Sequence, residues 1–375
     1  MIHQYKNNGY NIVMDVCSGA IHVVDDVTYD VIALYEEKSL EEIENELSYS
    51  KEDIEEAYKE VTSLKEEGLL FTEDIYEDYI KEVKSRKTVV KALCLHIAHD
   101  CNLACRYCFA EEGEYKGHRE LMSAKVGKAA LDFLVANSGN RHNLEVDFFG
   151  GEPTMNFGVV KEVVEYGRSL EEKHNKHFRF TLTTNGVLLN DEIMEFANKE
   201  MDNVVLSVDG RKEIHDYMRP TRNGKPSYDL IMPKFIRFAE SRHQQKYYVR
   251  GTFTNRNLDF SKDVLHLADL GFEQISMEPV VGQPEEPYAI QEKDLPQIFD
   301  EYDRLAKEMI KREKAGKGFN FFHFMIDLTG GPCVAKRLSG CGSGTEYLAV
   351  TPWGDLYPCH QFVGEEKFLL LQVCH

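Results

Sequence analysis

From residue 91 onward the sequence predicts an α/β fold built on a parallel sheet. Six strand-like segments alternate with amphipathic helical segments: ALCLHIA, LEVDFF, FRFTLT, NVVLSV, YYVRGTF and FEQISMEP. Repeated β–α alternation implies right-handed crossovers and therefore parallel strands. An open (β/α)6 barrel and a doubly wound sheet both satisfy this pattern, so the position of the chemical motifs has to decide between them.

Residues 1–72 are predicted to form a separate small domain. NIVMDV and IHVV have the composition of short strands, and Asp26 opens a short apolar helix. Capping boxes that begin at Ser39 and Ser50 start two further helices, and LLF is predicted as a closing strand. Two strands, three helices and a closing strand describe a winged-helix-like module. Residues 73–90 are predicted to be a charged linker.

Composition narrows the class of partner. The 375 residues carry a formal net charge of -20, which argues against nucleic acid because phosphate binding needs clustered Lys and Arg. No apolar segment has the length of a signal peptide or a membrane span, so we expect a cytoplasmic protein with no membrane partner. In a reducing compartment, nine cysteines favour metal ligands over disulfides.

Three cysteines follow the first predicted strand. Cys101, Cys105 and Cys108 have the spacing C-x(3)-C-x(2)-C in AHDCNLACRYCFAE. Three thiolates on one loop can hold one metal centre, and a zinc knuckle completed by His96 or His99 is the alternative. An iron–sulfur cluster usually takes four cysteines, so three would leave one iron with an open position.

Three further motifs end the next three predicted strands. Gly150-Gly151-Glu152-Pro153 ends the second, Thr184-Asn185-Gly186 the third and Ser207-Val208-Asp209-Gly210 the fourth. Each alone is compatible with an ordinary turn. Together with the cysteine loop they occupy the carboxyl ends of four consecutive strands, which is the catalytic face of a barrel. The motifs therefore favour the partial (β/α)6 barrel.

With these motifs the chain resembles the radical S-adenosylmethionine (SAM) enzymes. The resemblance implies that Cys101, Cys105 and Cys108 hold a site-differentiated [4Fe–4S] cluster that cleaves SAM reductively. It implies that Glu152 binds the methionyl amino group, that Ser207 contacts the ribose and that Arg219 pairs with the carboxylate. The further residues expected to bind this cofactor are Tyr107, Phe109, Gly150, Gly151, Pro153, Thr184, Asn185 and Asp209.

A second cysteine group lies near the C-terminus. Cys341 and Cys359 have the spacing C-x(12)-G-x(4)-C, and a hairpin of EYLAV and LYPC would bring them together. This segment resembles the opening of a SPASM domain and implies an auxiliary [4Fe–4S] cluster, with Cys333 as a further ligand. A structural zinc ribbon is the alternative. The later cysteine block of such domains is not found, so the SPASM region at 316–375 is expected to be truncated.

The whole pattern resembles the maturases of cysteine-rich SCIFF peptides. It implies a leader-binding domain at 1–72, a radical SAM barrel at 91–315, and formation of Cys thioether (sactionine) crosslinks in a ribosomally made precursor peptide. The expected partners are that cysteine-rich peptide with its leader and a small-protein electron donor. Two alternatives remain: an anaerobic sulfatase-maturating enzyme, although His360 stands where a carboxylate is expected there, and a non-catalytic Fe–S or zinc peptide-binding protein.

Overall fold

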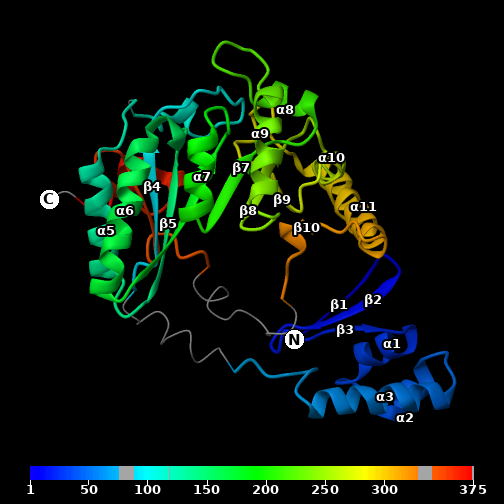
Figure 1. The fold of residues 1–375 in the computed structure, drawn as a ribbon. Helices are drawn as coiled ribbons and strands as arrows, with labels where there is room; N and C mark the ends of the chain where they lie inside the picture. The colour runs from blue at the N-terminus through cyan, green and yellow to red at the C-terminus, as the bar shows by residue number, and fades with distance from the viewer. Residues whose placement is uncertain (76–87, 118, 328–339, 374–375) are drawn as a thin grey trace. The chain divides into compact units, whose positions relative to one another are not determined.

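The computed structural model describes residues 1–75, 88–117, 119–327 and 340–373, and the chain divides into two compact units. Residues 1–75 belong to the N-terminal unit, and residues 88–325 and 341–373, apart from 118, belong to the barrel unit (Figure 1). Each unit has a hydrophobic core of its own. Most of the predicted linker and Cys333 lie outside the described residues.

The N-terminal unit consists of a three-stranded antiparallel sheet followed by three helices. The sheet has the order β1 (Ile2–Asn7), β2 (Tyr10–Asp15) and β3 (Ile21–Val24), and the helices are α1 (Asp26–Leu34), α2 (Leu40–Glu46) and α3 (Lys51–Glu66). Asn8 and Gly9 join β1 to β2 with φ of 51° and 82°, as a type I′ turn requires. The core comprises Val13, Val31, Ile32, Ile43, Ile54, Ala57, Val61 and Leu70.

Two expectations for this unit were wrong. Strand β1 was not predicted, and the closing strand at residues 69–71 is not formed. The amides of Leu69 and Leu70 both donate to the carbonyl of Leu64, at 2.9 and 3.2 Å, so the chain turns back on the end of α3. Phe71 then has a φ of +54°, which is incompatible with an extended strand.

The barrel unit contains the parallel strands that the sequence predicts. They are β4 (Ala92–Ala98), β5 (Asn143–Gly150), β6 (His177–Thr184), β7 (Asn203–Ser207), β8 (Tyr247–Phe253) and β9 (Gln274–Pro279). Each strand pairs with the next one along the chain, without the order reversal of a doubly wound sheet. The predicted α/β fold with a parallel sheet is therefore confirmed, and β10 (Asn320–Phe321) adds a short parallel strand beside β9.

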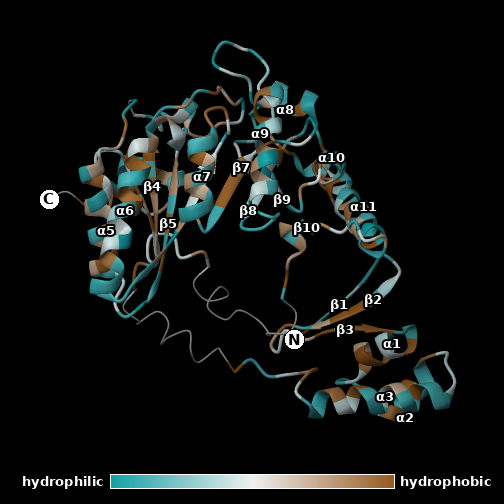
Figure 2. Cartoon of the chain, in the orientation of Figure 1, coloured by the Kyte–Doolittle hydropathy of each residue, from teal (hydrophilic) through white to brown (hydrophobic). Residues whose placement is uncertain are grey.

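Helices connect these strands and pack against them (Figure 1). They are α5 (Ala124–Asn137), α6 (Phe157–His174), α7 (Asp191–Glu200), α8 (Lys212–Met218), α9 (Tyr228–Ser241), α10 (Ser261–Asp269) and α11 (Leu295–Lys314). Figure 2 shows hydrophobic residues along the strands and mixed faces on α5 and α11, as amphipathic helices require. No helix in the described parts of the chain is long and apolar enough to cross a membrane.

The predicted C-terminal hairpin forms, and it joins the barrel sheet. Strand β11 (Tyr347–Val350) pairs antiparallel with β12 (Asp355–Tyr357), and β13 (Leu371–Gln372) follows as the outermost strand. On its other side β11 pairs in parallel with β4, with Ala349 opposite Cys94. The sheet therefore continues from the barrel into the second cysteine region.

The separate cores predict separate unfolding of the two units. Ile54 is completely buried in the N-terminal unit, and Leu206 is completely buried in the barrel. We expect Ile54→Ala to lower the stability of the N-terminal unit by about 2–5 kcal/mol through lost packing. Scanning calorimetry should show only the N-terminal transition shifted to lower temperature, and Leu206→Ala should give the converse. A single transition shifted by both substitutions would contradict independent cores.

Candidate active site

A cavity of about 270 Å³ lies at the carboxyl ends of the barrel strands. Its wall begins with the cysteine loop after β4 and continues through the ends of β5 and β6, the last residue of β7 and the upper halves of β8 and β9. His360 and Gln361, from the segment after β12, complete the lining. One cavity therefore collects residues from most of the barrel strands.

The cysteine loop is fixed by backbone hydrogen bonds to the segment after α8. The amide of Ala104 donates to the carbonyl of Pro220 at 2.8 Å, and the amide of Arg106 donates to that of Met218 at 2.9 Å. Leu103 also forms an isolated bridge with Thr221. These bonds hold the loop in place, and Cys101, Cys105 and Cys108 all line the cavity.

The thiol chemistry fits a metal cluster. None of the three cysteines forms a disulfide, and burial raises the pKa of Cys101 and of Cys105 to about 12. Such thiols stay protonated unless a metal ion displaces the proton. Among the residues that the structure describes, no three His, Cys, Asp or Glu side chains converge on a single metal ion, as zinc would require.

The zinc knuckle with His96 or His99 finds no support in the position of the two imidazoles. Nδ1 of His96 lies 2.9 Å from Nε2 of His99, and both rings are fully buried against Tyr115. Neither histidine lines the cavity that the three thiols share.

Gly150 and Gly151 permit contact between two backbones. A Cβ on Gly150 would lie 2.4 Å from the carbonyl oxygen of Ala98, and a Cβ on Gly151 would lie 2.1 Å from that of Asp100. The amides of Gly151 and Glu152 donate to these same two carbonyls at 2.8 Å. Glycine is therefore required at both positions because the backbone passes close to the start of the cysteine loop. From the sequence we expected Gly150 and Gly151 to bind the cofactor.

The Glu152 carboxylate accepts four hydrogen bonds from donors in the protein. Its Oε1 accepts hydrogen bonds from the amide and hydroxyl of Thr154 and from the hydroxyl of Thr184 at 2.7 Å. Its Oε2 accepts one bond, from the amide of Asn185 at 2.7 Å. Each carboxylate oxygen offers about two acceptor positions, so Oε2, which accepts one bond from the protein, can accept one more from a ligand. Burial raises the pKa of Glu152, and these hydrogen bonds oppose that shift.

Asn185 links the end of β6 to the cysteine loop. Its Nδ2 donates to Oδ1 of Asn102 at 2.7 Å and lies 3.6 Å from Sγ of Cys101. Its own Oδ1 accepts from the amide of Val187 at 3.0 Å, which fixes the side-chain orientation. Asn185 can therefore position the Cys101 sulfur.

Asp209 lies behind the cavity wall and binds three of the residues that form it. The Tyr107 hydroxyl donates to both carboxylate oxygens of Asp209, at 2.7 and 2.8 Å. Nε of Arg219 lies 3.0 Å from Oδ1, and the amide of Thr252 donates to the same oxygen at 3.0 Å. The carboxylate is completely buried and does not line the cavity. A role of Asp209 in cofactor binding stays a prediction, and its contacts with Tyr107, Arg219 and Thr252 indicate that it would act through these residues.

The other residues expected to bind the cofactor do come together around the cavity: Tyr107, Phe109, Gly150, Gly151, Glu152, Pro153, Thr184, Asn185, Ser207 and Arg219. The second cysteine group lies apart from this lining. Burial is the largest cause that raises the pKa of Cys359, and the Cys341 thiol adds to this shift. The amide of Gly344 and the hydroxyl of Ser343 both bind the carbonyl of Pro358, which fastens the two ends of the hairpin.

Polar residues in the part of the cavity formed by β8 and β9 were not predicted from the sequence. Glu278 accepts from Ser276 at 2.8 Å and from Nε2 of His323 at 2.8 Å, and Tyr302 lies 2.9 Å from Nδ1 of that histidine. The bond from His323 is the main cause that lowers the pKa of Glu278, so the carboxylate is ionised at neutral pH. Arg250, on the adjacent strand β8, also lines the cavity.

Comparison with known proteins agrees with this geometry. Residues 95–242 match the radical SAM superfamily. An uncharacterised protein of Methanocaldococcus jannaschii is 30% identical over 223 residues, which cover 59% of this chain and 71% of that protein. The chain belongs to the radical SAM superfamily, and membership implies a [4Fe–4S] cluster and SAM as cofactors.

Two characterised proteins are also similar. The cysteine-type anaerobic sulfatase-maturating enzyme of Clostridium novyi is 25% identical over 283 residues, which cover 71% of this chain and 72% of that enzyme. The structure of Streptococcus suis SuiB bound to its precursor peptide SuiA has the same fold, with a TM-score of 0.55 and 16% identity over 100% of this chain and 85% of that one.

The backbone contact at Gly151 can be tested by one substitution. A Cβ here would overlap the backbone of Asp100, which cannot move without displacing the cysteine loop. We expect Gly151→Ala to cost about 1–3 kcal/mol in stability and to lower the iron content after reconstitution. Gly158→Ala is the matched control, because a Cβ there meets nothing within 4 Å. Equal iron content in the two variants would show that the contact is dispensable.

Proposed function

We propose that the chain is a peptide maturase that uses the radical SAM reaction to form thioether (sactionine) crosslinks in a ribosomally made, cysteine-rich peptide. The main support for this proposal is the cavity in which the three-cysteine loop faces the ends of the barrel strands. The cluster, when bound, supplies the electron for reductive cleavage of SAM. Cys101, Cys105 and Cys108 would hold it, and Asn185 would orient the first of these ligands.

The remaining wall divides into two regions with different proposed roles. The free acceptor position on Oε2 of Glu152 suits the methionyl amino group of SAM, and Arg219 suits its carboxylate because a guanidinium binds carboxylates bidentately. Ser207 lies at the end of β7, where it can contact the ribose. Glu278 and Arg250 carry opposite charges farther around the wall, and we assign them to the substrate peptide.

The second cysteine group supports handling of a substrate sulfur. Cys341 and Cys359 lie at the two ends of one hairpin, and we propose that they ligate an auxiliary [4Fe–4S] cluster. Cys333, which lies outside the described residues, is proposed as a further ligand. The segment that follows Cys359 contributes His360 and Gln361 to the cavity, so this region borders the proposed substrate site.

The N-terminal unit is proposed to bind the leader of the precursor peptide. Among the described residues β3 pairs with β2 on one edge and with no strand on the other, and Val23 on β3 is 65% exposed. An exposed edge can accept an extended peptide as an additional strand. The relation in fold to SuiB, whose structure contains its bound precursor peptide, spans this unit as well as the barrel.

Formylglycine formation is the second candidate, because the similarity to a sulfatase-maturating enzyme covers most of both chains. The residue after Cys359 is His360, and its identity favours the thioether reaction over one that needs a carboxylate base there. The products separate the two: a thioether costs the peptide two hydrogens and keeps its sulfur, whereas formylglycine formation from cysteine removes the sulfur. Mass spectrometry of a cysteine-rich peptide after the reaction decides between them.

Cofactor cleavage should depend on the three-cysteine loop. We expect the triple variant Cys101→Ala, Cys105→Ala, Cys108→Ala to form no 5′-deoxyadenosine with SAM and dithionite under anaerobic conditions, because no other described group offers three thiols in this cavity. Cys17→Ala, in the N-terminal unit, is the control and should retain activity. Continued cleavage by the triple variant would refute the assignment.

Leader binding should depend on the edge of β3. Val23→Asp adds a charge to an exposed position, and a charge on an edge strand opposes pairing with another strand. We expect weaker binding of the precursor peptide, measured by fluorescence anisotropy, with unchanged formation of 5′-deoxyadenosine in the absence of peptide. Lys59→Asp, on the exposed face of α3, is the control. Equal peptide affinity in both variants would rule out this edge.

A further inference from the structure

An exposed tyrosine lies between two arginines beside the cysteine loop. Cζ of Arg106 lies 4.4 Å from the ring centroid of Tyr217, and Cζ of Arg256 lies 4.5 Å from it. Tyr217 is 40% exposed, and both arginines are exposed. We call Arg106, Tyr217 and Arg256 the arginine–tyrosine stack.

The stack lies on the outer side of the loop that carries the three thiols. Arg106 stands between Cys105 and Tyr107, which both line the cavity, whereas Arg106 does not. Its amide is bonded to the carbonyl of Met218, and its Nε donates to the carbonyl of Tyr217 at 2.7 Å. The position of the stack relative to Cys105 is therefore fixed by the backbone.

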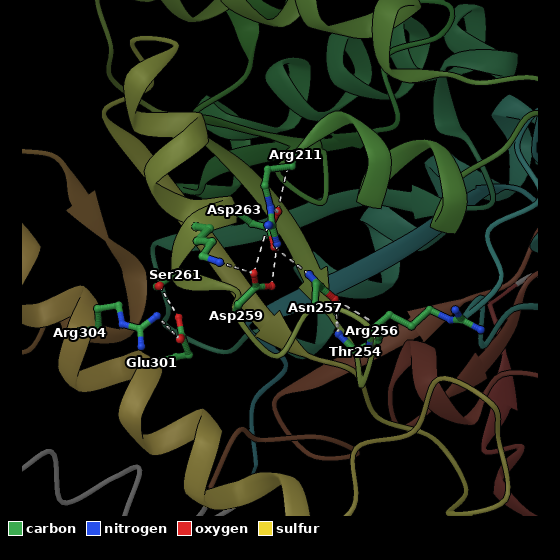
Figure 3. Close-up of polar contacts among 10 residues, drawn as sticks. Arg211, Thr254, Arg256, Asn257, Asp259, Ser261, Asp263, Glu301 and Arg304 are labelled. Carbon is green, nitrogen blue, oxygen red and sulfur yellow. Dashed lines mark hydrogen bonds and ion pairs between the residues drawn. The ribbon is translucent and has the colours of Figure 1, made fainter.

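The carboxylates of Asp259, Asp263 and Glu301 already form ion pairs with cations other than Arg256. Figure 3 shows Arg211 bound to Asp259 at 2.7 Å and to Asp263 at 2.8 Å, and it shows Arg304 bound to Glu301 at 2.7 Å. Lys262 also binds Asp259, at 3.1 Å. The Arg256 guanidinium extends away from this network and makes none of the contacts drawn (Figure 3).

The stack is thus a local positive site on a strongly acidic chain. Within the described residues neither Arg106 nor Arg256 forms an ion pair, although the formal net charge is -20. Asp216, next to Tyr217, accepts hydrogen bonds from the amides of Ser227 and Tyr228. Two guanidinium groups against one ring repel each other, and an acidic partner would relieve this repulsion.

We propose that the arginine–tyrosine stack is the docking surface for a small acidic redox protein that reduces the cluster. This inference rests on the proposed function, because only a cluster held by the adjacent cysteines needs the electron. In the step, one electron leaves the donor and enters the oxidised cluster, and no bond forms or breaks. Complementary charge would orient the donor and raise its association rate at low ionic strength.

The test compares a protein donor with a small-molecule donor. The reconstituted full chain and the variants R256E and R106E/R256E are reduced either with dithionite or with reduced flavodoxin, an acidic electron-transfer protein. Cluster bleaching is followed by stopped-flow absorbance, and flavodoxin binding is measured separately by calorimetry. With flavodoxin we expect bleaching to slow by on the order of tenfold or more, since electrostatic steering changes association rates by 10–10³. With dithionite the rate should stay within about twofold of the original chain.

Two further variants and the comparison with R256E alone make the outcome decisive. The control K125E/K173E changes the net charge by the same amount as R106E/R256E, but at positions on α5 and α6. It should retain flavodoxin-driven bleaching. R106K/R256K keeps the charge and should retain most of the rate. R256E alone leaves Arg106 and the cysteine loop unchanged, so a slower reaction with this variant is not explained by a disturbed loop. The inference is overturned if R256E is reduced by flavodoxin as fast as the original chain, or if both donors slow equally with it. Failure of the unaltered chain to cleave SAM with dithionite would instead refute the proposed function.

Discussion

The direct contact between the backbone of Gly150–Gly151 and the backbone of residues 98–100 is the constraint on which the rest of the site depends. It joins the end of β5 to the start of the cysteine loop, and two amide hydrogen bonds of 2.8 Å close it. Because the contact places Glu152 immediately next to the loop, that carboxylate can bind Thr154 and the end of β6 together. Contacts within the protein therefore hold this part of the cavity wall in place.

A second buried carboxylate organises the opposite part of the wall. Asp209 receives bonds from Tyr107, Arg219 and the amide of Thr252, and it thereby ties together the cysteine loop, the segment after α8 and β8. A buried charge that lost one of these donors would keep its desolvation cost, which makes such a network sensitive to single substitutions. The residues that touch the cavity are consequently held by residues that do not.

Much of the barrel could be predicted from the sequence because its signals are local. The six strands, five of the helices and the hairpin around Gly354 each show in a short window of residues. Strand β1 was missed although Asn8–Gly9 is a strong hairpin signal, and α11 was missed although its amphipathic pattern extends from Leu295 to Lys314. In these two cases the signal was present and was not used.

Other features could not be predicted, because they depend on residues far apart in the chain. Glu278 and His323 are separated by 45 positions, and only the pairing of β9 with β10 and the turn after it bring them into contact. The bend at residues 69–71 depends on the end of α3, whereas local composition favours a strand there. The role of Asp209 likewise required the position of Tyr107, which no spacing reveals.

The pairing of β11 with β4 has a consequence for the integrity of the barrel. All seven residues of β4 are buried, and the strand has β5 on one side and β11 on the other. Proteolytic removal of the hairpin would leave β4 as an open edge with no charged residue along it, the kind of edge that recruits strands from other molecules. The hairpin that brings the second cysteine group to the barrel therefore also protects the first strand from intermolecular pairing, and its loss would expose an edge that promotes aggregation.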